Sequence, residues 1–451
     1  MVAKALISVF SAPGKMGYFI RKRLAFAEFY VTIKDKDERQ VRPVDRTYTL
    51  FMQAVKAALQ ARQADWGEDV TADDLVKVLV LSREHHVLPL VFEAVYTCPA
   101  AKALEPGRYA QFRSICVHSI MNQTLKTEEF LELYAQWRQA GLKPLVVKGL
   151  ICRQLYPLPD SRFSGDEDVF AGADFEGCRR VMESAGLEAC GGASDDYEIP
   201  FRREGSPLYI ELHKTLFPAD SDIFGDCNRL FDDAFRRAVE VDADGTAVAT
   251  LCPTDHMLYL IVHAFKHFLH SGFGIRQVCD MILFAGTYGD RVDWGYVRKK
   301  CRTIRAEGFA AALFAIGKKY LGFDPEQARC GWAAGADPEP LLEDLLRGGI
   351  YGSTDRSRLH SSNMTLNAVA ADKKGKKSGG NLLKTLFPPA KSIDNRFAYL
   401  RQMPWLLPVA WVCRLFGYAR ESISAPDSGA AEAIRIGSER IELLRHYGII
   451  D

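Results

Sequence analysis

The sequence predicts an α+β protein, with a small mixed sheet between two helical regions. Apolar residues recur at helical spacing in residues 46–140 and again after residue 254, whereas residues 141–250 alternate short apolar runs with turn residues. We therefore expect four parts: an N-terminal extension (1–45), a helical region (46–140), an α/β core (141–250) and a C-terminal helical domain (251–451).

The composition indicates a folded protein without a strong overall charge. Of its 451 residues, 48% are hydrophobic, and 58 Lys and Arg side chains oppose 57 Asp and Glu side chains. This balance does not indicate nucleic acid as a partner, because nucleic-acid-binding domains usually carry excess positive charge. Eleven cysteines lie singly, with no CxxC pair, which is typical of reduced thiols. No apolar run reaches the ~18 residues that span a bilayer. We expect no transmembrane segment and a cytoplasmic location.

Residues 1–45 differ from the rest of the chain. An apolar and basic stretch at 16–29 precedes a charge cluster at 34–39. The stretch is either a basic amphipathic arm that touches a membrane or partner, or a loosely packed extension. Pro13 and Gly14 interrupt the first apolar run too early for a signal peptide.

The helical regions carry start and stop signals. Thr71, in front of two aspartates, predicts the start of a helix. Thr254 and Asp255 predict the cap of another. The polar, basic and glycine-rich residues 372–381 predict a flexible loop, and residues 428–447 predict a final helix.

The α/β core is expected to contain four strands and one helix. Apolar alternation and turn residues mark the strands, and Gly186 ends the helix. A turn at Glu204 and Gly205 predicts that the last two strands pair as a hairpin. The strands are expected at residues 142–147, 165–171, 197–201 and 208–213, and the helix at residues 174–185.

Three acidic residues of these strands carry the chemical interpretation. Asp166 and Asp168 lie two apart, so on a strand their carboxylates point to the same side. Glu211 lies in the centre of a later strand and can supply a third acid or act as general base. Carboxylates that face one point repel one another unless cations lie between them. The pattern predicts that Asp166, Asp168 and Glu211 bind divalent metal, although two aspartates at this spacing are also common in exposed loops.

Lys148 and Gly149 follow an apolar run and precede a helix-like stretch, an arrangement that suits a phosphate. Gly149 allows close backbone approach, and the first N–H groups of the next helix can bind an anion. Lys148 is expected either to reach a triphosphate or to be the solvated end of a strand. Arg162, four residues before Asp166, is expected to contact phosphate or steady the acids, with an exposed loop arginine as the alternative.

Histidines accompany both the strands and the following helix. His213 shares the face of the third acid, so it is expected to orient an acid or contact substrate, unless it is a core histidine. His263, His267 and His270 lie near one helix face together with Lys266. Their spacing can bind zinc, but no acidic partner accompanies them. We expect a polar helix face at which Lys266 contacts the nucleotide or the acceptor.

Several longer stretches together resemble a known family. They read KGLICRQLYPLPDSRFSGDEDVFAGADF, IELHKTLF, DHMLYLIVHAFKH and RQVCDMILF, followed by LFPPAKSIDNRF and PWLLPVAWVCRL, between about residues 75 and 420. In this order they are similar to the uncharacterised nucleotidyltransferase family of the DNA polymerase β-like superfamily. The resemblance implies a nucleotidyltransferase core flanked by helices, with an NTP and Mg²⁺ as cofactors. It places Lys148 and Gly149 in the glycine motif, Asp166 and Asp168 in the metal pair, and Glu211 as the third acid.

Two residues depart from that family's pattern. Leu150 follows Gly149 where the superfamily usually has Ser or Gly, which removes a hydroxyl contact to phosphate. Glu167 lies between the aspartates, where an apolar residue usually packs on the core. A carboxylate on a buried face costs several kcal/mol unless it is paired or protonated. We therefore expect an edge strand, a basic partner for Glu167, or an altered site.

The leading hypothesis is a nucleotidyltransferase that uses Mg²⁺ or Mn²⁺ to move NMP from an NTP, with ATP favoured, to a hydroxyl of an acceptor that the sequence does not identify. One alternative is a catalytically degenerate nucleotidyltransferase fold that acts as a binding module, which Glu167 and Leu150 favour. The other is a glycosyltransferase, in which a DxD motif holds manganese and a nucleotide sugar. Glu211 and the turn at Lys148 and Gly149 argue against the second alternative.

Overall fold

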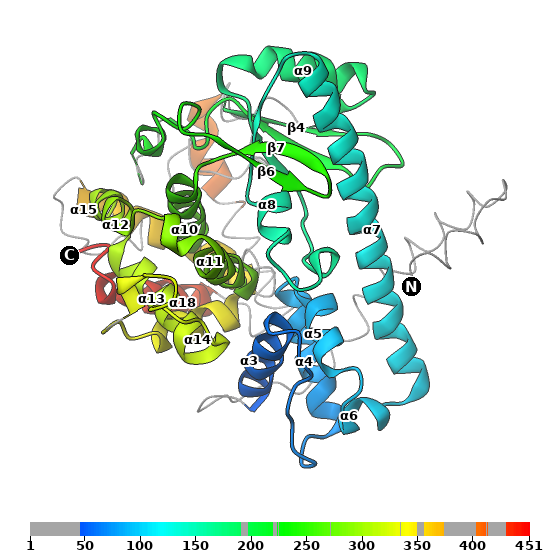
Figure 1. Ribbon diagram of the computed structural model, residues 1–451. Coiled ribbons are helices and arrows are strands. Elements are labelled where there is room, and N and C mark those ends of the chain that lie inside the picture. The colour runs from blue at the N-terminus through cyan, green and yellow to red at the C-terminus, as the bar shows by residue number, and fades with distance from the viewer. Residues whose placement is uncertain are drawn as a thin grey trace. The chain divides into compact units, whose positions relative to one another are not determined.

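A five-stranded mixed sheet separates two sets of helices along the chain, which confirms the predicted α+β class (Figure 1). The computed structural model describes residues 46–190, 197–219, 223, 225–270, 272–333, 335–349, 356–373, 403–411, 413 and 430–451. Residues 1–45, with the expected basic arm, lie outside the described residues. Residues Arg46–Asp451 form one unit.

The sheet has the strand order β1-β2-β5-β4-β3. β1 (Leu145–Val147) runs antiparallel to β2 (Glu167–Phe170), and β2 runs parallel to β5 (Tyr209–His213). β4 (Glu198–Arg202) is antiparallel to both β5 and the short β3 (Glu188–Ala189).

The four predicted strands and the helix between them, α9 (Phe175–Ser184), are confirmed. So is the hairpin of β4 and β5, whose turn contains Gly205 with a positive φ of 79°. β2 has a strand on each side, so the expectation that Glu167 lies on an edge strand is wrong.

The structure adds a hairpin that the sequence analysis does not predict. β6 (Val239–Ala243) and β7 (Thr246–Thr250) pair antiparallel, and β7 packs against β1. Asp244 and Gly245 form the two-residue turn, both with positive φ. An Asp-Gly pair between two alternating runs is a strong signal for such a turn, so the sequence does contain the information.

Helices before the sheet build a largely apolar body. They are α3 (Arg46–Leu59), α4 (Ala72–Glu84), α5 (Leu88–Val95), α6 (Pro99–Lys102) and α7 (Pro106–Gln139). Thr71 caps α4 as predicted, because its Oγ1 accepts the Asp74 N–H (3.1 Å) while the Asp74 carboxylate accepts the Thr71 N–H (3.0 Å). The long helix α7 contacts α5 and α9, and so links these helices to the sheet (Figure 1).

The helices after the sheet begin with α10 (Pro253–His270). Thr254 and Asp255 lie inside its first turn, so the predicted cap is wrong. Thr254 Oγ1 instead accepts the Asp293 N–H (3.0 Å), and Asp255 forms an ion pair with Arg237.

The later helices are α11 (Ile275–Tyr288), α12 (Trp294–Thr303), α13 (Glu307–Ile316), α14 (Glu339–Gly348), α15 (Arg356–Lys373) and α18 (Ala430–His446). The last of these confirms the predicted final helix. Because α15 continues to Lys373, the first two residues of the loop expected at 372–381 are helical. The remaining residues of that loop lie outside the described residues.

One face of the sheet is covered by helices. Val169 of β2 and Leu212 of β5 pack in one apolar cluster with Trp137 of α7 and Met182 of α9. Neighbouring residues of a strand point to opposite faces. The residues next to Val169 and Leu212 in each strand therefore point away from α7 and α9, and these include two of the predicted acids.

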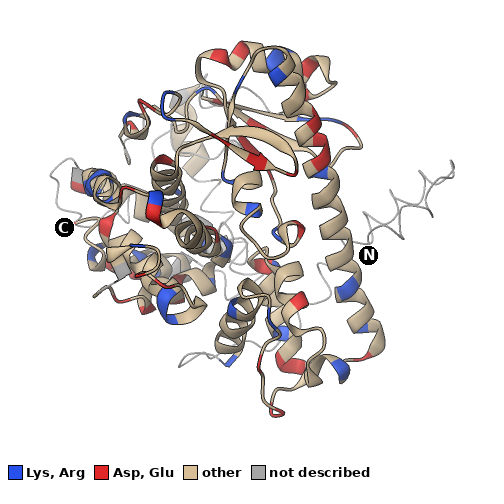
Figure 2. Cartoon of the chain, in the orientation of Figure 1, with Lys and Arg blue, Asp and Glu red and all other residues tan. Residues whose placement is uncertain are grey.

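The distribution of charged side chains and the state of the cysteines agree with what the composition predicts. Lys and Arg are interspersed with Asp and Glu along the described elements (Figure 2). All eleven cysteines are free. Within the described part of the chain, every helix is too short or too polar to cross a bilayer.

Candidate functional site

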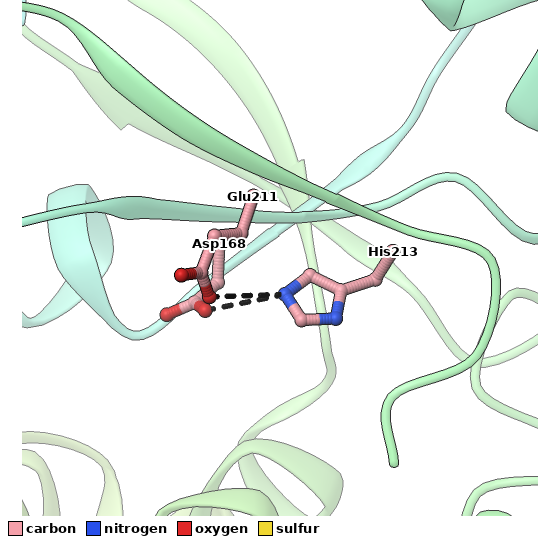
Figure 3. A group of neighbouring side chains, drawn as sticks. All are labelled: Asp168, Glu211 and His213. Carbon is pink, nitrogen blue, oxygen red and sulfur yellow. Dashed lines mark hydrogen bonds and ion pairs between the residues drawn. The ribbon is translucent and has the colours of Figure 1, made fainter. Parts of the chain in front are cut away.

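Asp168, Glu211 and His213 converge on the face of the sheet that points away from α7 and α9. Asp168 belongs to β2 and the other two to β5, and the parallel register sets Asp168 beside Glu211. Because side chains alternate, His213 returns to the same face two residues later. Each residue offers one ligand atom, and these atoms all lie within 4.8 Å of one another. The imidazole faces both carboxylates (Figure 3).

The Asp168 carboxylate is buried and has a partner on each oxygen. Its Oδ2 lies 2.7 Å from Lys148 Nζ, and its Oδ1 lies 3.3 Å from His213 Nε2. Burial alone would raise the pKa of Asp168, but the Lys148 ammonium and His213 hold this pKa well below its usual range. Asp168 is therefore ionised at neutral pH.

Glu211 and His213 have several acidic side chains around them. Burial, followed by Asp168, Asp166 and Glu198, raises the pKa of Glu211 to about 7. Burial would lower the pKa of His213, but its hydrogen bond to Asp168 and the nearby carboxylates raise it above its ordinary value. His213 Nε2 lies 3.9 Å from Glu211 Oε2, and Nδ1 lies 3.4 Å from Glu198 Oε2. Acids around His213 thus outnumber bases, which favours a bound cation.

Lys148 reaches Asp168 from an unusual backbone turn. It follows β1 and precedes α8 (Gly149–Arg153), and Val147 lies directly opposite Asp168 in the β1–β2 pair. Its φ of 61° is uncommon for a residue other than glycine. Its backbone N–H donates to His256 Nε2 (3.1 Å). Lys148 is only 7% exposed, so the alternative of a solvated strand end is wrong.

Asp166 lies beside the three converging residues, not among them. β2 begins one residue later, and the Asp166 carbonyl accepts a hydrogen bond from Ser164 Oγ (2.6 Å). The Asp166 charge still contributes to the raised pKa of Glu211. Metal binding by Asp166 stays a prediction.

Glu167 points to the opposite face and has basic partners, one of the three arrangements expected for it. Its Oε1 lies 2.6 Å from Arg153 Nη2 and 3.9 Å from Lys126 Nζ, and all three side chains are almost completely buried. Its Oε2 accepts the Leu150 N–H (2.8 Å). The charge of Glu167 is thus compensated inside the fold.

This contact changes the interpretation of the glycine. A Cβ on Gly149 would collide with the Glu167 carboxylate, so the close approach that glycine permits here is to a protein side chain. The Leu150 N–H, at the start of α8, binds the same carboxylate. One of the N–H groups expected to bind phosphate is therefore occupied by Glu167.

Arg162 belongs to a buried ion pair. Its Nε and Nη2 lie 2.9 Å and 2.7 Å from the two oxygens of Asp280 in α11, and the Tyr156 hydroxyl donates to the same carboxylate (2.8 Å). Arg162 is 2% exposed, so the alternative of an exposed loop arginine is wrong. The expected contact of Arg162 with phosphate is not tested, and the structure gives this side chain the role of joining the segment before β2 to α11.

Two histidines of α10 lie next to Lys148. His263 Nε2 is 3.3 Å from Lys148 Nζ and 3.2 Å from His267 Nε2. Burial, reinforced by the Lys148 charge, lowers the pKa of His263 well below its ordinary value and that of His267 to about 3. Lys266 is half-buried, with Nζ 5.7 Å from the centre of the Tyr197 ring. The expected polar face is present. Its residue His263 contacts Lys148, and Lys148 in turn contacts Asp168.

A family model described as "Uncharacterised nucleotidyltransferase" matches residues 71–322. The chain belongs to this family. The match contains the five-stranded sheet and α10, and with them every residue of the candidate site. It ends before the C-terminal stretches for which a resemblance was expected. No curated protein and no solved structure is significantly similar to the chain. Membership of the family supports a role in nucleotidyl transfer in general.

The donor atoms fit the divalent cation that a nucleotidyltransferase uses. Asp168 and Glu211 offer carboxylate oxygens, the ligands that Mg²⁺ and Mn²⁺ prefer. The His213 imidazole suits Mn²⁺ better than Mg²⁺. A bound cation would also compensate the excess of carboxylate charge around His213.

The sequence does not predict every residue that contacts the site. His256 supports the Lys148 backbone from α10, and Glu198 lies beside His213 from β4. Nothing in the spacing of either residue marks it. The alternation of β5, by contrast, predicts that His213 lies on the face of Glu211, as the structure shows.

Proposed function

We propose that this member of the family is a metal-dependent nucleotidyltransferase that moves NMP from an NTP, with ATP as the first candidate, to a hydroxyl of an acceptor. The observation that carries the proposal is the convergence of Asp168, Glu211 and His213 beside the Lys148 ammonium. An acid-rich group next to a buried cation suits a metal-bound triphosphate. The free cysteines agree with the cytoplasmic location that we propose.

The chain's own residues would hold and orient the reactants. Asp168, Glu211 and His213 would bind the cation, with Asp166 as an additional acid. When bound, Mg²⁺ or Mn²⁺ supplies charge neutralisation at the phosphates and activates the acceptor hydroxyl. The sheet fixes the relative positions of Asp168 and Glu211 through the register of β2 and β5, so these two carboxylates need little rearrangement.

Positive side chains beside the acids would contact the triphosphate. Lys148 is held next to Asp168, and Lys266 lies on α10, the helix that supplies the neighbouring His263. We do not extend this role to Arg162, because its guanidinium is bound by both oxygens of Asp280.

Transfer of label tests the proposal. The purified chain is incubated with each α-³²P-labelled NTP, Mg²⁺ or Mn²⁺ and a cell extract, and the labelled product is identified. We expect label transfer that Asp168→Ala or Asp166→Ala abolishes without loss of the fold. Glu188→Gln, which removes an exposed acid of β3 in the same sheet, is the matched control and keeps activity. Full activity in both aspartate variants would refute the assignment.

A binding module with a degenerate site is the second candidate. The observation in its favour is that the Leu150 N–H at the start of α8 is occupied by Glu167. Titration with ATP, with and without Mg²⁺, separates the two: metal-dependent binding supports the enzyme, and metal-independent binding without label transfer supports the module. Mass spectrometry of a modified acceptor excludes the glycosyltransferase alternative if the added mass is that of an NMP.

A further inference from the structure

We propose that the Lys148 ammonium takes the place of a second divalent cation, so that the site binds a single metal ion beside a protein cation. The inference rests on the proposed function and specifies its cofactor. Asp168, Glu211 and His213 would hold one ion, in place of the metal pair expected for a two-metal nucleotidyltransferase.

The two oxygens of Asp168 have different partners. Oδ2 lies 2.7 Å from Lys148 Nζ, whereas Oδ1 lies 3.3 Å from His213 Nε2. A carboxylate that serves two metal ions offers one oxygen to each. Here an ammonium already binds one oxygen, and the other faces the remaining ligand atoms.

The backbone around Lys148 keeps the ammonium in this position. Val147, the residue before it, is fixed opposite Asp168 by the β1–β2 register. The positive φ of Lys148 is held by the hydrogen bond from its N–H to His256 Nε2. A non-glycine residue keeps such a conformation only where its surroundings impose it. Lys148 is therefore fixed beside Asp168 by its backbone, unlike a surface lysine whose side chain is free to move.

The charges near Lys148 also disfavour a second ion. An ion bound to Asp168 Oδ2 would lie close to the ammonium in a buried region, where like charges repel strongly. Nζ also lies 3.3 Å from Nε2 of the neutral His263 imidazole, which in turn contacts His267, and neither histidine brings negative charge. Across the part of the chain that the structure describes, a single group of three metal-ligating residues is present, and it does not include Asp166.

Electron paramagnetic resonance of bound Mn²⁺ tests the inference on the unmodified, full-length chain. Mn²⁺ is titrated in the presence of a non-hydrolysable ATP analogue, and the spectrum is recorded at saturation. We expect the signal of an isolated ion, about one per chain. The signal of two magnetically coupled ions would overturn the inference and leave the proposed function intact. Failure of the chain to bind Mn²⁺ would overturn both.

Removal of the ammonium gives a second readout that does not depend on activity. We expect Lys148→Met to tighten the binding of Mn²⁺ alone by at least about tenfold in calorimetry, because the ammonium no longer competes for Asp168. Lys148→Arg keeps the positive charge and is expected to bind Mn²⁺ like the unmodified chain. Lys143→Met, which removes an exposed lysine two residues before β1, is the matched control and leaves affinity unchanged. Unchanged affinity in a folded Lys148→Met variant would overturn the inference.

Discussion

Glu167 and Asp168 are neighbours in β2, both almost fully buried, and they serve different ends. Glu167 points toward α7 and α8, where Arg153 and Lys126 compensate its charge and the Leu150 N–H binds its second oxygen. Asp168 points to the other face of the sheet. There it meets one ammonium, from Lys148, and lies beside further acids.

The difference lies in the balance of charge and not in burial. On the Glu167 side, two basic groups surround one carboxylate. On the Asp168 side, Lys148 forms an ion pair with Asp168, and burial together with the neighbouring acids raises the pKa of Glu211 to about 7. A buried acid whose charge is compensated by basic partners supports the fold. A group of acids with too few basic partners instead favours the binding of a cation.

The largest effect is expected from Asp168→Asn. It keeps the shape of the side chain and removes a charge that the metal and Lys148 need, so nucleotidyl transfer should fall by at least about 1000-fold. Initial rates of label transfer measure this loss. A rate within a few-fold of the unmodified protein would place Asp168 in the same structural class as Glu167.

Glu167→Ala is expected to lower stability instead. It leaves Arg153 and Lys126 buried without their acid, which costs about 3–5 kcal/mol in the free energy of unfolding. Urea denaturation followed by circular dichroism measures it. The double variant Arg153→Met/Glu167→Leu removes the closest pair together and should recover much of the loss. A stable but inactive Glu167→Ala variant would contradict the division between the two faces.

Arg162→Met tests whether that arginine belongs to the fold or to the nucleotide. It leaves the buried Asp280 with only the Tyr156 hydroxyl among the partners described above, so we expect a loss of about 3 kcal/mol in the free energy of unfolding. ATP affinity of the folded fraction should stay unchanged. A large loss of ATP affinity at full stability would assign Arg162 to phosphate binding.

Acidification is expected to weaken the hydrogen bond by which His256 supports the Lys148 backbone. Burial lowers the pKa of His256 to about 3, below its ordinary value. The unfolded chain therefore binds the extra proton first. The contribution of His256 to stability is complete above about pH 6.5 and falls by up to about 1.4 kcal/mol per pH unit toward the folded pKa, in addition to the same effect from His263 and His267. Unfolding curves between pH 7 and pH 5 measure the slope. His256→Gln should reduce it, and an unchanged slope would exclude His256 as its source.

Local pattern predicts much of this molecule because the relevant signals lie close together in the chain. Alternation in β5 predicts that Glu211 and His213 share a face, and the turn at Gly205 predicts the hairpin. The pair of Asp244 and Gly245 carries an equally local signal for the hairpin of β6 and β7.

Long-range pairing accounts for what the sequence does not predict. Arg162 finds its acid 118 residues later, in α11. Lys148 reaches Asp168 only because the β1–β2 register and an unusual backbone turn bring it there. No spacing rule indicates that Glu167 would take the Leu150 N–H, because this contact depends on how α8 packs on the sheet.

The position of a bound cation is the most direct test of the site. Crystals of the full-length chain grown with MnCl₂ and a non-hydrolysable ATP analogue would give an anomalous difference map at the manganese edge. We expect a peak among Asp168 Oδ1, Glu211 and His213 Nε2, beside Lys148. A map with its manganese peaks elsewhere, and with Asp168, Glu211 and His213 bound only to one another and to Lys148, would contradict the assignment of these residues as the metal site.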